Sequence, residues 1–326
     1  MSDINLVTAI NLALARALAE DQNVVLLGED IGINGGVFRA TDGLSKRFGD
    51  DRVRDTPISE ATIAGLSIGL ALEGFKPVAE IQFSGFVYPC IDQIANHASR
   101  FRTRTRGRLS CPMVLRTPWS GGTKALEHHS EANEAMFTNI PGLRVVIPSS
   151  PKQAYGLLLA AIRDPDPVVF LEPTRLYRAA VENFEDDGVA AALDKCLVRR
   201  QGSDLSLVAW GAMVPQALAT AEALAAKGVS AEVIDVQTLR PLDETTILDS
   251  IRKTGRCVIV QEAGRTGGFS GEIAARIAES AFESLLAPVT RVTGYDIVLP
   301  LPRLEDLFLP NAARIGAAAE KVMAYA

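Results

Sequence analysis

Residues 58–86 read ISEATIAGLSIGLALEGFKPVAEIQFSGF, and this stretch decides the fold class. Its first part, from Ser59 to Gly74, is a run of small and apolar residues that predicts a helix, with Ser59 as the N-cap. Residues 78–83, VAEIQF, then alternate in the way that is typical of a strand. A helix followed directly by a strand is the repeating unit of α/β folds.

The same alternation of helices and strands extends in both directions from this stretch. Further helices are expected at 6–20, 86–104, 150–163, 214–227, 242–253 and 272–282. Further strands are expected at 24–28, 113–116, 143–147, 167–171, 205–211, 231–236 and 257–261. Such a pattern predicts mostly parallel sheets with helices on both faces.

A change in composition divides the chain into two units. Residues 182–188, ENFEDDG, are acidic and aperiodic, and we interpret about 175–203 as the connection. We therefore predict a first α/β domain over 1–185, including the linker from about 175, and a second, smaller α/β domain over 204–326. Two domains also fit a length of 326 residues.

The composition excludes several classes of protein. The chain is 48% hydrophobic and 22% charged, as globular proteins are, and its net charge of −6 argues against a nucleic-acid partner. The N-terminus lacks a signal-peptide pattern, and the most apolar segment, 61–72, is too short to span a bilayer, so no membrane partner is expected. The four cysteines have no metal-ligand spacing, which favours a reduced, cytoplasmic protein.

Two carboxylates near the ends of expected elements are candidate functional groups. Glu60 lies just past the N-cap of its helix, and we expect that helix to be buried on most sides. The neighbours that suggest this are Ala61, Ile63, Ala64, Leu66 and Ile68. Desolvation would raise the proton affinity of Glu60 and suit proton exchange with a bound base, whereas a favourable charge at the helix dipole is the alternative. Glu29 follows a strand, where ligands bind in open α/β sheets.

The three histidines differ in context. His97 lies within an expected helix, where a polar-face position is the simplest interpretation. His128 and His129 lie in a polar loop, and adjacent side chains point in different directions, so a shared metal is disfavoured. The functional alternative is that one of them faces a pocket as a proton donor.

Glycines mark two further features. Gly264 to Gly271 follow an expected strand and precede a helix, where backbone amides can hold a phosphate. The segment matches neither G-x-G-x-x-G nor the P-loop, so a tight turn is favoured over a nucleotide site. Gly65 and Gly69 are four residues apart on the small-residue helix, a spacing that lets another backbone approach at a domain or subunit contact.

Several segments together resemble one protein family. They are LGEDIGINGGVFRATDGL (27–44), DRVRDTPISEATIAGLSIGLAL (51–72), PVAEIQFSGFVYPCIDQI (77–94), LRTPWSGG (115–122) with EHHSEANEAMF (127–137), GLRVVIPSSPKQAYGLLLAAIRDPDPVVFLEPTRLYR (142–178), and KTGRCVIVQEA (253–263) with GGF (267–269). The chain resembles the beta subunit of the decarboxylase component of 2-oxo acid dehydrogenase complexes, whose members include pyruvate, branched-chain and acetoin dehydrogenases. The resemblance covers residues 4–325.

The resemblance implies a fold and a cofactor. The fold is α/β, a thiamine-diphosphate pyrimidine-binding domain followed by a transketolase C-terminal-like domain. Glu60 matches the carboxyl that bonds the pyrimidine nitrogen of thiamine diphosphate and promotes the tautomer that deprotonates the thiazolium carbon. Phe86 matches the ring that stacks on the aminopyrimidine, with Gln82 and the Ile58 backbone beside it. Glu29 matches a residue that supports this proton network.

The resemblance also implies a role for one histidine and a place for metal ions. His129 matches the histidine that donates a proton as the lipoyl dithiolane opens, whereas His128 matches a variable position. Backbone carbonyls are implied to form a potassium site at Cys111, Met113, Val114, Ala161, Asp164 and Asp166. The chain has no G-D-G motif for Mg²⁺ and diphosphate, and Gly49-Asp50-Asp51 is only a near miss. Mg²⁺ is therefore expected on an alpha subunit, in a heterotetramer of two alpha and two beta chains.

The expected activity is oxidative decarboxylation of pyruvate or a branched-chain 2-oxo acid, with acyl transfer to the lipoyl group of a dihydrolipoyl acyltransferase core. The C-terminal domain is the candidate docking surface for that core. A pocket gains only about 1–3 kcal/mol per methylene, so the substrate stays open, although GFVYP and NGGVFRAT favour pyruvate.

Three alternatives remain from the sequence. They are an acetoin dehydrogenase beta subunit, a noncatalytic assembly subunit, and a nucleotide-dependent oxidoreductase that uses the Gly264–Gly271 loop. Retention of Glu60, Phe86 and His129 speaks against the assembly subunit, and the missing dinucleotide fingerprint speaks against the oxidoreductase.

Overall fold

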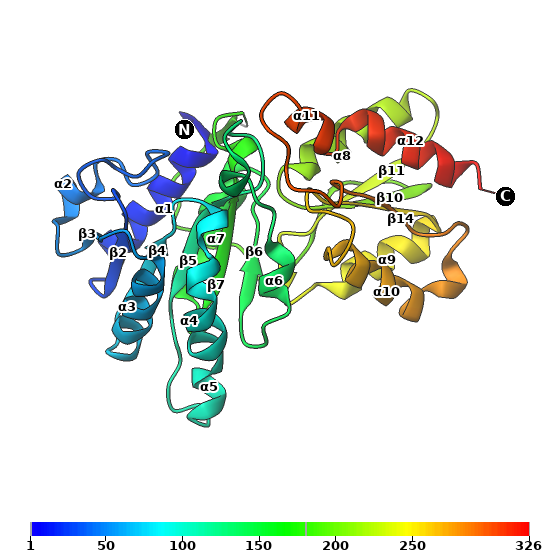
Figure 1. The fold of residues 1–326 in the computed structure, drawn as a ribbon. Coiled ribbons are helices and arrows are strands. Elements are labelled where there is room, and N and C mark those ends of the chain that lie inside the picture. The colour runs from blue at the N-terminus through cyan, green and yellow to red at the C-terminus, as the bar shows by residue number, and fades with distance from the viewer. Residues whose placement is uncertain (1, 180, 326) are drawn as a thin grey trace.

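Two α/β units lie side by side in the computed structural model, which describes residues 2–179 and 181–325 (Figure 1). The N-terminal unit is built on a seven-stranded sheet and the C-terminal unit on a five-stranded sheet. The predicted fold class, two α/β units with mostly parallel sheets, is confirmed. The exact division at 185 and 204 stays a prediction, which limited proteolysis would test.

The seven-stranded sheet carries fully buried strands at its centre. Its order is β12 (Thr238–Arg240), β6 (Arg144–Val146), β7 (Val168–Pro173), β5 (Val114–Trp119), β4 (Lys76–Glu80), β2 (Val24–Gly28) and β3 (Val53–Asp55). All neighbouring strands are parallel except β12, which runs antiparallel to β6. Every residue of β2, VVLLG, is buried, as a parallel strand covered on both faces requires.

The five-stranded sheet and a small ribbon complete the strands. The sheet order is β14 (Thr290–Val292), β13 (Cys257–Val260), β10 (Leu205–Ala209), β11 (Ala231–Asp235) and β9 (Leu197–Arg200), with β9 antiparallel. The ribbon pairs β1 (Ser2–Asn5) with β8 (Val181–Phe184). The stretch of about 175–203 that we interpret as the connection therefore contains two strands, β8 and β9, that the sequence did not predict. Both are edge strands with exposed positions, so neither needs the hydrophobic pattern that reveals a central strand.

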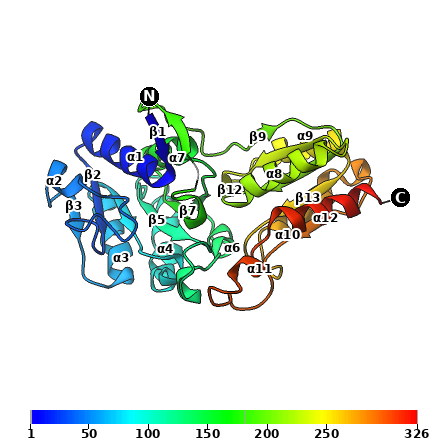
Figure 2. The ribbon, with the colours of Figure 1, turned by 90° about the horizontal axis from the view of Figure 1, so that it is seen from above.

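Helices cover both faces of each sheet (Figure 2). The first unit has α1 (Leu6–Glu20) and α7 (Pro151–Arg163) on one face and α3 (Glu60–Leu72) and α4 (Ile91–Asn96) on the other. The second unit has α8 (Met213–Ala225) and α12 (Ala312–Met323) opposite α9 (Glu244–Thr254) and α10 (Ser270–Ser280). The shorter helices are α2 (Leu44–Phe48), α5 (Phe101–Arg104), α6 (Glu134–Thr138), α11 (Glu305–Phe308), η1 (Ser84–Phe86), η2 (Tyr88–Cys90), η3 (Ala98–Arg100), η4 (Glu127–His129), η5 (Thr174–Leu176) and η6 (Phe282–Ser284).

The hydrophobic core consists of two layers, and each layer runs through both units. Leu26 of β2 belongs to the layer under α1, α7, α8 and α12, whereas its neighbour Leu27 belongs to the layer under α3, α4, α9 and α10. Successive strand residues point to opposite faces, so one apolar strand supplies both layers. The two units are thus packed on a shared core.

The expected continuous helix over 86–104 is wrong. The chain forms η2, α4, η3 and α5 there in succession. Pro89 lies within η2 and has no N–H to donate, and His97 leaves helical geometry with φ −120° and ψ −73°. The break at η1 and η2 directs Phe86 toward the loop that carries η4.

One strand ties the second unit to the first sheet. β12 follows β11 in the chain but pairs with β6, and the Ile147 N–H donates to the Gln237 carbonyl at 2.8 Å. Among the residues that the structure describes, no helix is both long enough and apolar enough to cross a membrane.

Candidate active site

Two carboxyl groups meet where β2 ends and α3 begins. Glu29 directly follows β2, and the backbone N–H of Ser59, the N-cap of α3, donates to its carboxylate. Glu29 is 6% exposed, and its Oε1 has no partner within residues 2–179 and 181–325. Burial raises the pKa of Glu29, and the nearby charges of Glu60 and Asp30 raise it further against the opposing Ser59 N–H.

Glu60 is the first residue of α3 and is only half-buried. The Cys90 thiol donates to its carbonyl oxygen at 3.2 Å, which holds η2 against the start of α3. Burial raises the pKa of Cys90 to about 12, and the charges of Glu60 and Glu29 act in the same direction. Both carboxylates therefore lie close to this thiol.

The expectation that α3 is buried on most sides is wrong for this chain alone. Leu66 is 45% exposed, Ala61 and Gly69 are also exposed, and a Cβ at Gly69 would meet nothing within 4 Å. The buried residues of α3, such as Ile63 and Ala64, follow one face. The small side chains lie on the exposed face of α3. Only another chain could bury this face.

An aromatic cluster joins the segment after β4 to the histidine loop. The ring of Phe83 lies edge-on to Phe86 with centroids 5.7 Å apart and edge-on to His129 at 4.4 Å. Phe86 and His129 are themselves 5.4 Å apart. The structure thus brings together two side chains that the sequence singled out separately, and Phe83 is the contact between them that sequence reasoning missed.

Hydrogen bonds fix the histidine loop onto η1. Ser84 Oγ donates to the Glu131 carbonyl at 2.6 Å, and Asn133 Nδ2 donates to the Ser84 carbonyl at 2.9 Å. At Gly85, a Cβ would overlap the carbonyl oxygen of His128, so only glycine permits this approach. The loop is therefore held at a fixed position beside Phe86.

The imidazole of His129 lies in a poorly solvated position. Burial lowers its pKa, and the charge of His128 lowers it further. Its Nδ1 is buried without a partner in the described part of the chain. The unused nitrogen of such an imidazole can accept a proton, and the imidazolium that results can donate it.

The other two residues expected beside the cofactor lie on the same edge of the sheet. Gln82 follows β4, and its Nε2 donates to Asp30 Oδ2 at 3.4 Å, next to Glu29. Ile58 precedes α3 and is 85% exposed. All five expected cofactor residues thus lie around the carboxyl ends of β2 and β4 and the start of α3.

The residues expected at the potassium site lie at the opposite edge, where β5 and β7 begin. The carbonyls of Cys111, Met113 and Ala161 each accept one backbone N–H, from Met113 at 2.8 Å, Val168 at 3.0 Å and Asp164 at 3.3 Å. Asp164 pairs with Arg144 and Asp166 with Arg102. The described residues contain no cluster of three or more His, Cys, Asp or Glu side chains that could hold a metal. A site made of carbonyls, Val114 included, stays a prediction.

A buried ionic network lies beneath the site and was missed. Arg116 on β5 bonds Glu172 on β7 through Nε at 2.6 Å and Nη2 at 2.9 Å, and it also bonds Glu80 on β4. The Tyr177 hydroxyl donates to Glu172 at 2.5 Å. The signal was visible as charged residues within apolar strands, VLRTPW, KPVAE and VVFLEP.

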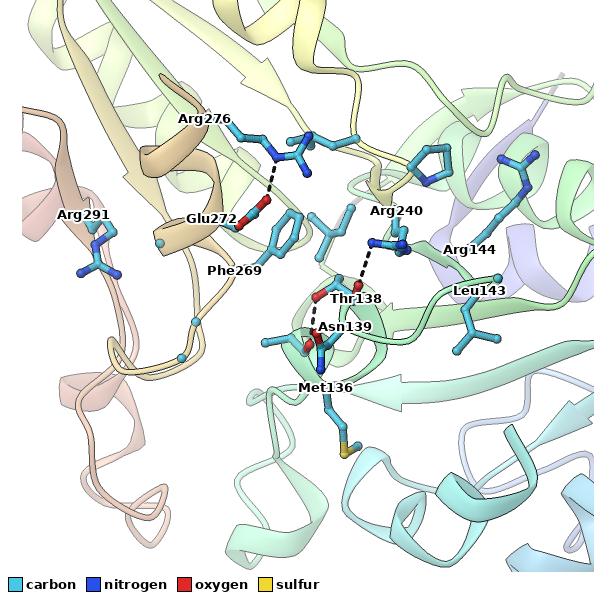
Figure 3. Close-up of a pocket in the computed structure, with 18 of the residues that line it drawn as sticks. Met136, Thr138, Asn139, Leu143, Arg144, Arg240, Phe269, Glu272, Arg276 and Arg291 are labelled. Atoms are coloured by element: carbon cyan, nitrogen blue, oxygen red, sulfur yellow. Dashed lines mark hydrogen bonds and ion pairs between the residues drawn. The ribbon is translucent and has the colours of Figure 1, made fainter. Parts of the chain in front are cut away.

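A large cavity lies elsewhere in the molecule. It has a volume of about 1180 Å³, lies between the two units, and is bordered by Met136, Arg240, Phe269 and Arg276 (Figure 3). Arg276 is already engaged by Glu272 at 2.8 Å and Glu244 at 2.9 Å. None of the proposed cofactor residues lines it.

The glycine loop 264–271 borders this cavity and is closed by a side chain. Gln261 Nε2 donates to the Gly264 carbonyl at 2.6 Å, and the Ser270 N–H donates to Gln261 Oε1 at 2.8 Å. A Cβ at Gly268 would overlap this amide. These contacts favour the tight turn over a nucleotide site.

Comparisons with known proteins identify the family of each domain. Residues 2–180 match the transketolase pyrimidine-binding domain family, and residues 194–315 match the transketolase C-terminal domain family. The chain is 47% identical to a pyruvate dehydrogenase E1 component subunit beta of Acholeplasma laidlawii over 322 residues, which cover 99% of this chain and 98% of that one. It is 46% identical to the protein of the same name from Bacillus subtilis (strain 168) over 325 residues, which cover 100% of both chains.

A solved structure supports the fold. It is a split gene transketolase, an inactive beta4 tetramer, which superposes with a TM-score of 0.82 over 99% of both chains at 24% identity. At that identity the likeness concerns the arrangement of the two domains and not the chemistry.

Proposed function

We propose that this chain, which belongs to the family of pyruvate dehydrogenase E1 component beta subunits, acts with an alpha subunit in the oxidative decarboxylation of pyruvate. The observation that carries the proposal is the convergence of Glu29, Glu60, Phe86 and His129 at one open edge of the first sheet. The names of the relatives favour pyruvate over branched-chain 2-oxo acids and acetoin.

The residues present fit thiamine diphosphate. An aminopyrimidine needs a carboxyl that exchanges a proton with a ring nitrogen, an aromatic face, and further polar partners. Glu60, Phe86 and Gln82 offer these groups, the backbone of Ile58 lies at the same edge, and the buried, unpartnered Oε1 of Glu29 marks a polar position that still lacks a contact. When bound, this cofactor supplies a thiazolium carbon that attacks the keto carbon of a 2-oxo acid.

In this arrangement Glu60 holds a proton at the position of the pyrimidine nitrogen. Glu29 lies close enough for the two carboxylates to repel, and no salt bridge to either is found in the described residues. Protonation of Glu29 relieves that repulsion, which is the direction in which its pKa is raised. Phe86 would provide the stacking surface for the ring.

His129 would act in the second half-reaction. As the S–S bond of the lipoyl group breaks, one sulfur bonds the acyl carbon and the other takes a proton from the imidazole. The two electrons that reduce the disulfide come from the carbon–carbon bond that releases CO₂. The lowered pKa of His129 makes its proton easier to give up.

The rest of the site would come from an alpha subunit. No G-D-G motif is present in the sequence, so Mg²⁺ and the diphosphate would be held by that partner. The open face of α3, with Gly65, Leu66 and Gly69, is the surface we assign to a close subunit contact in a heterotetramer of two alpha and two beta chains. We assign docking of the dihydrolipoyl acyltransferase core to the C-terminal domain.

We propose the potassium site because several backbone carbonyl oxygens there have a free lone pair. The carbonyls of Cys111, Met113 and Ala161 each use one lone pair in a backbone hydrogen bond, which leaves a second for a cation. Thermal unfolding of the assembled enzyme in equal concentrations of K⁺ and Na⁺ would test it. We expect a higher Tm in K⁺, and an equal Tm would contradict the site.

The test of this function separates its two half-reactions. The His129→Ala variant, assembled with the alpha subunit, should lose acylation of a lipoyl domain while it keeps dye-linked decarboxylation. Pyruvate, 3-methyl-2-oxobutanoate and acetoin are compared in the wild-type enzyme, and the fastest turnover is expected with pyruvate. If His129→Ala acylates lipoyl domains at the wild-type rate, its role is wrong, and if no substrate is turned over by a stable assembly, the chain is a bracing subunit instead.

A further inference from the structure

Two histidine rings lie against each other beside the candidate site. The ring centroids of His128 and His129 are 4.2 Å apart, with their planes inclined by 43°. Phe86 contacts both, at 5.6 Å from His128 and 5.4 Å from His129. The three rings therefore form a closed triangle, and His128 is one of its corners.

The backbone holds this triangle in place. The two histidines end the short helix η4, which is closed by the His129 N–H to the Leu126 carbonyl at 3.0 Å and the Ser130 N–H to the Glu127 carbonyl at 2.9 Å. The carbonyl of His128 lies directly against Gly85 of η1. The backbone of His128 is therefore packed directly against η1, on which Phe86 lies.

The charged groups around the pair are few. Glu127 Oε1 lies 3.6 Å from His128 Nδ1. The neighbouring groups on the loop, on η2 and on the second unit are engaged elsewhere: Glu131 with Tyr88, Lys124 with Asp306, Glu262 with Arg175, and Asp296 with Thr266. Among the described residues, His128 and Glu127 are the charged groups that act on His129, and they act in opposite directions.

We propose that His128 is a positioning residue that sets the protonation state of His129 during acyl transfer, an inference that rests on the proposed function. Two imidazolium charges at this separation repel. A positive charge on His128 therefore disfavours a positive charge on His129. When His128 is neutral, His129 can carry the proton that it gives to the leaving sulfur.

Two substitutions separate charge from packing. His128→Phe keeps a ring against Phe86 and His129 but removes the charge, and His128→Gln removes both ring and charge. Each variant, with ¹³C-labelled histidine in the beta chain only, is assembled with an unlabelled alpha subunit. The chain has three histidines, so His97→Gln and His129→Ala assign the NMR signals, and His97→Gln also serves as the control that leaves His129 unchanged.

The inference predicts the same titration shift in both variants. The pKa of His129 should rise once the neighbouring charge is gone. The midpoint of the pH dependence of the lipoyl acylation rate should shift by the same amount. The pH dependence of dye-linked decarboxylation should not change. A purely structural role of His128 would lower rates without moving either titration.

Two results would overturn the inference. An unchanged His129 titration in both variants would show that the rings are not coupled. A shift in His128→Gln but not in His128→Phe would assign the effect to loss of the ring and not of the charge. Failure of the proposed function is seen separately, because it appears as normal acylation by His129→Ala and does not depend on the titration of His129.

Discussion

Glu80 and Glu172 lie on β4 and β7 with the guanidinium of Arg116 between them, whereas Glu29 and Glu60, at the end of β2 and the start of α3, have no such cation among residues 2–179 and 181–325. Burial raises the pKa of Glu80, and Arg116 acts against this. Burial also raises the pKa of Glu29, but there the nearby charges, Glu60 and Asp30, add to the effect. The same sheet thus holds one compensated and one uncompensated pair of carboxylates.

The difference separates a structural pair from the pair that we propose for binding a ligand. Buried charges that are paired on every side are costly to disturb but have no free group to offer. The Glu29 carboxylate keeps an oxygen that is unpartnered among the described residues and lies next to an open surface, where a bound group can reach it. The large cavity in Figure 3 has space and arginines but no such unpartnered carboxylate pair.

The largest effect is expected on the uncompensated pair. Glu60→Gln in the assembled enzyme should lower dye-linked turnover by about 10²–10⁴-fold, the range for loss of a positioned acid–base group. The matched control is Glu73→Gln, an exposed residue at the other end of α3, which should retain full turnover. Equal turnover rates for the two variants would show that the uncompensated carboxylate pair has no catalytic role.

The compensated pair should respond in stability instead. Arg116→Met leaves Glu80 and Glu172 buried without their cation, so the free energy of unfolding should fall by about 3–5 kcal/mol. Arg102→Met removes an exposed ion pair with Asp166 and should cost at most about 1 kcal/mol. Urea unfolding of both variants measures these changes. If the free energy of unfolding falls by a similar amount in both, the buried network has no special structural role.

Another buried carboxyl, that of Glu134 on α6, makes the stability of the fold depend on pH. It lies between the two units near Trp119 and Trp210, both of its oxygens lack a partner in the described residues, and burial raises its pKa from 4.5 to about 7. The folded state therefore binds this proton more tightly than the unfolded state. Its contribution to stability is fully present below pH 4.5 and is lost as the pH rises through 7.

Glu134→Gln should therefore be about as stable as the wild type at pH 4.5 and more stable by roughly 3 kcal/mol at pH 8, since each pKa unit corresponds to about 1.4 kcal/mol. Thermal or urea unfolding at both pH values measures the difference. Glu279→Gln on the exposed side of α10 is the control and should not change with pH. A constant difference between Glu134→Gln and the wild type at the two pH values would contradict the account.

The smallest effect is expected for Tyr177, at the edge of the buried network around Arg116. Tyr177→Phe removes the hydroxyl that donates to Glu172 but leaves Arg116 in place, so it should cost about 1.5 kcal/mol, the low end for a bond to a charged group. Tyr325→Phe, at an exposed position, should change nothing measurable in the same urea titration. A cost as large as that of Arg116→Met would mean that Tyr177 and not Arg116 compensates the carboxylates.

Much of the fold follows from local patterns. Strands such as β2 and β10 are fully apolar because parallel strands are buried on both faces, and their helices carry clear apolar stripes. The edge strands β8, β9 and β12 were missed because they are short and are defined by their partners. The breaks at Pro89 and His97 were visible only in part, since His97 has no local signal for leaving a helix.

In the candidate site, too, the sequence predicted some features and not others. Glu29, Glu60, Phe86 and His129 were found from motifs, but their contacts depend on the register of β2 and β4 and on the loop after β5. Arg116 finds its partners on two neighbouring strands, 36 and 56 residues away in the sequence, and no local pattern specifies such a pairing. The expected burial of Glu60 failed because α3 turns its small residues outward.

The central claim is that this chain supplies one half of a catalytic site. The most direct measurement is dye-linked decarboxylation of pyruvate, with thiamine diphosphate and Mg²⁺, by this chain alone, by its alpha subunit alone, and by the two together. The account predicts turnover only in the mixture. Turnover by this chain alone, or turnover by the alpha subunit that is unchanged when this chain is added, would contradict it.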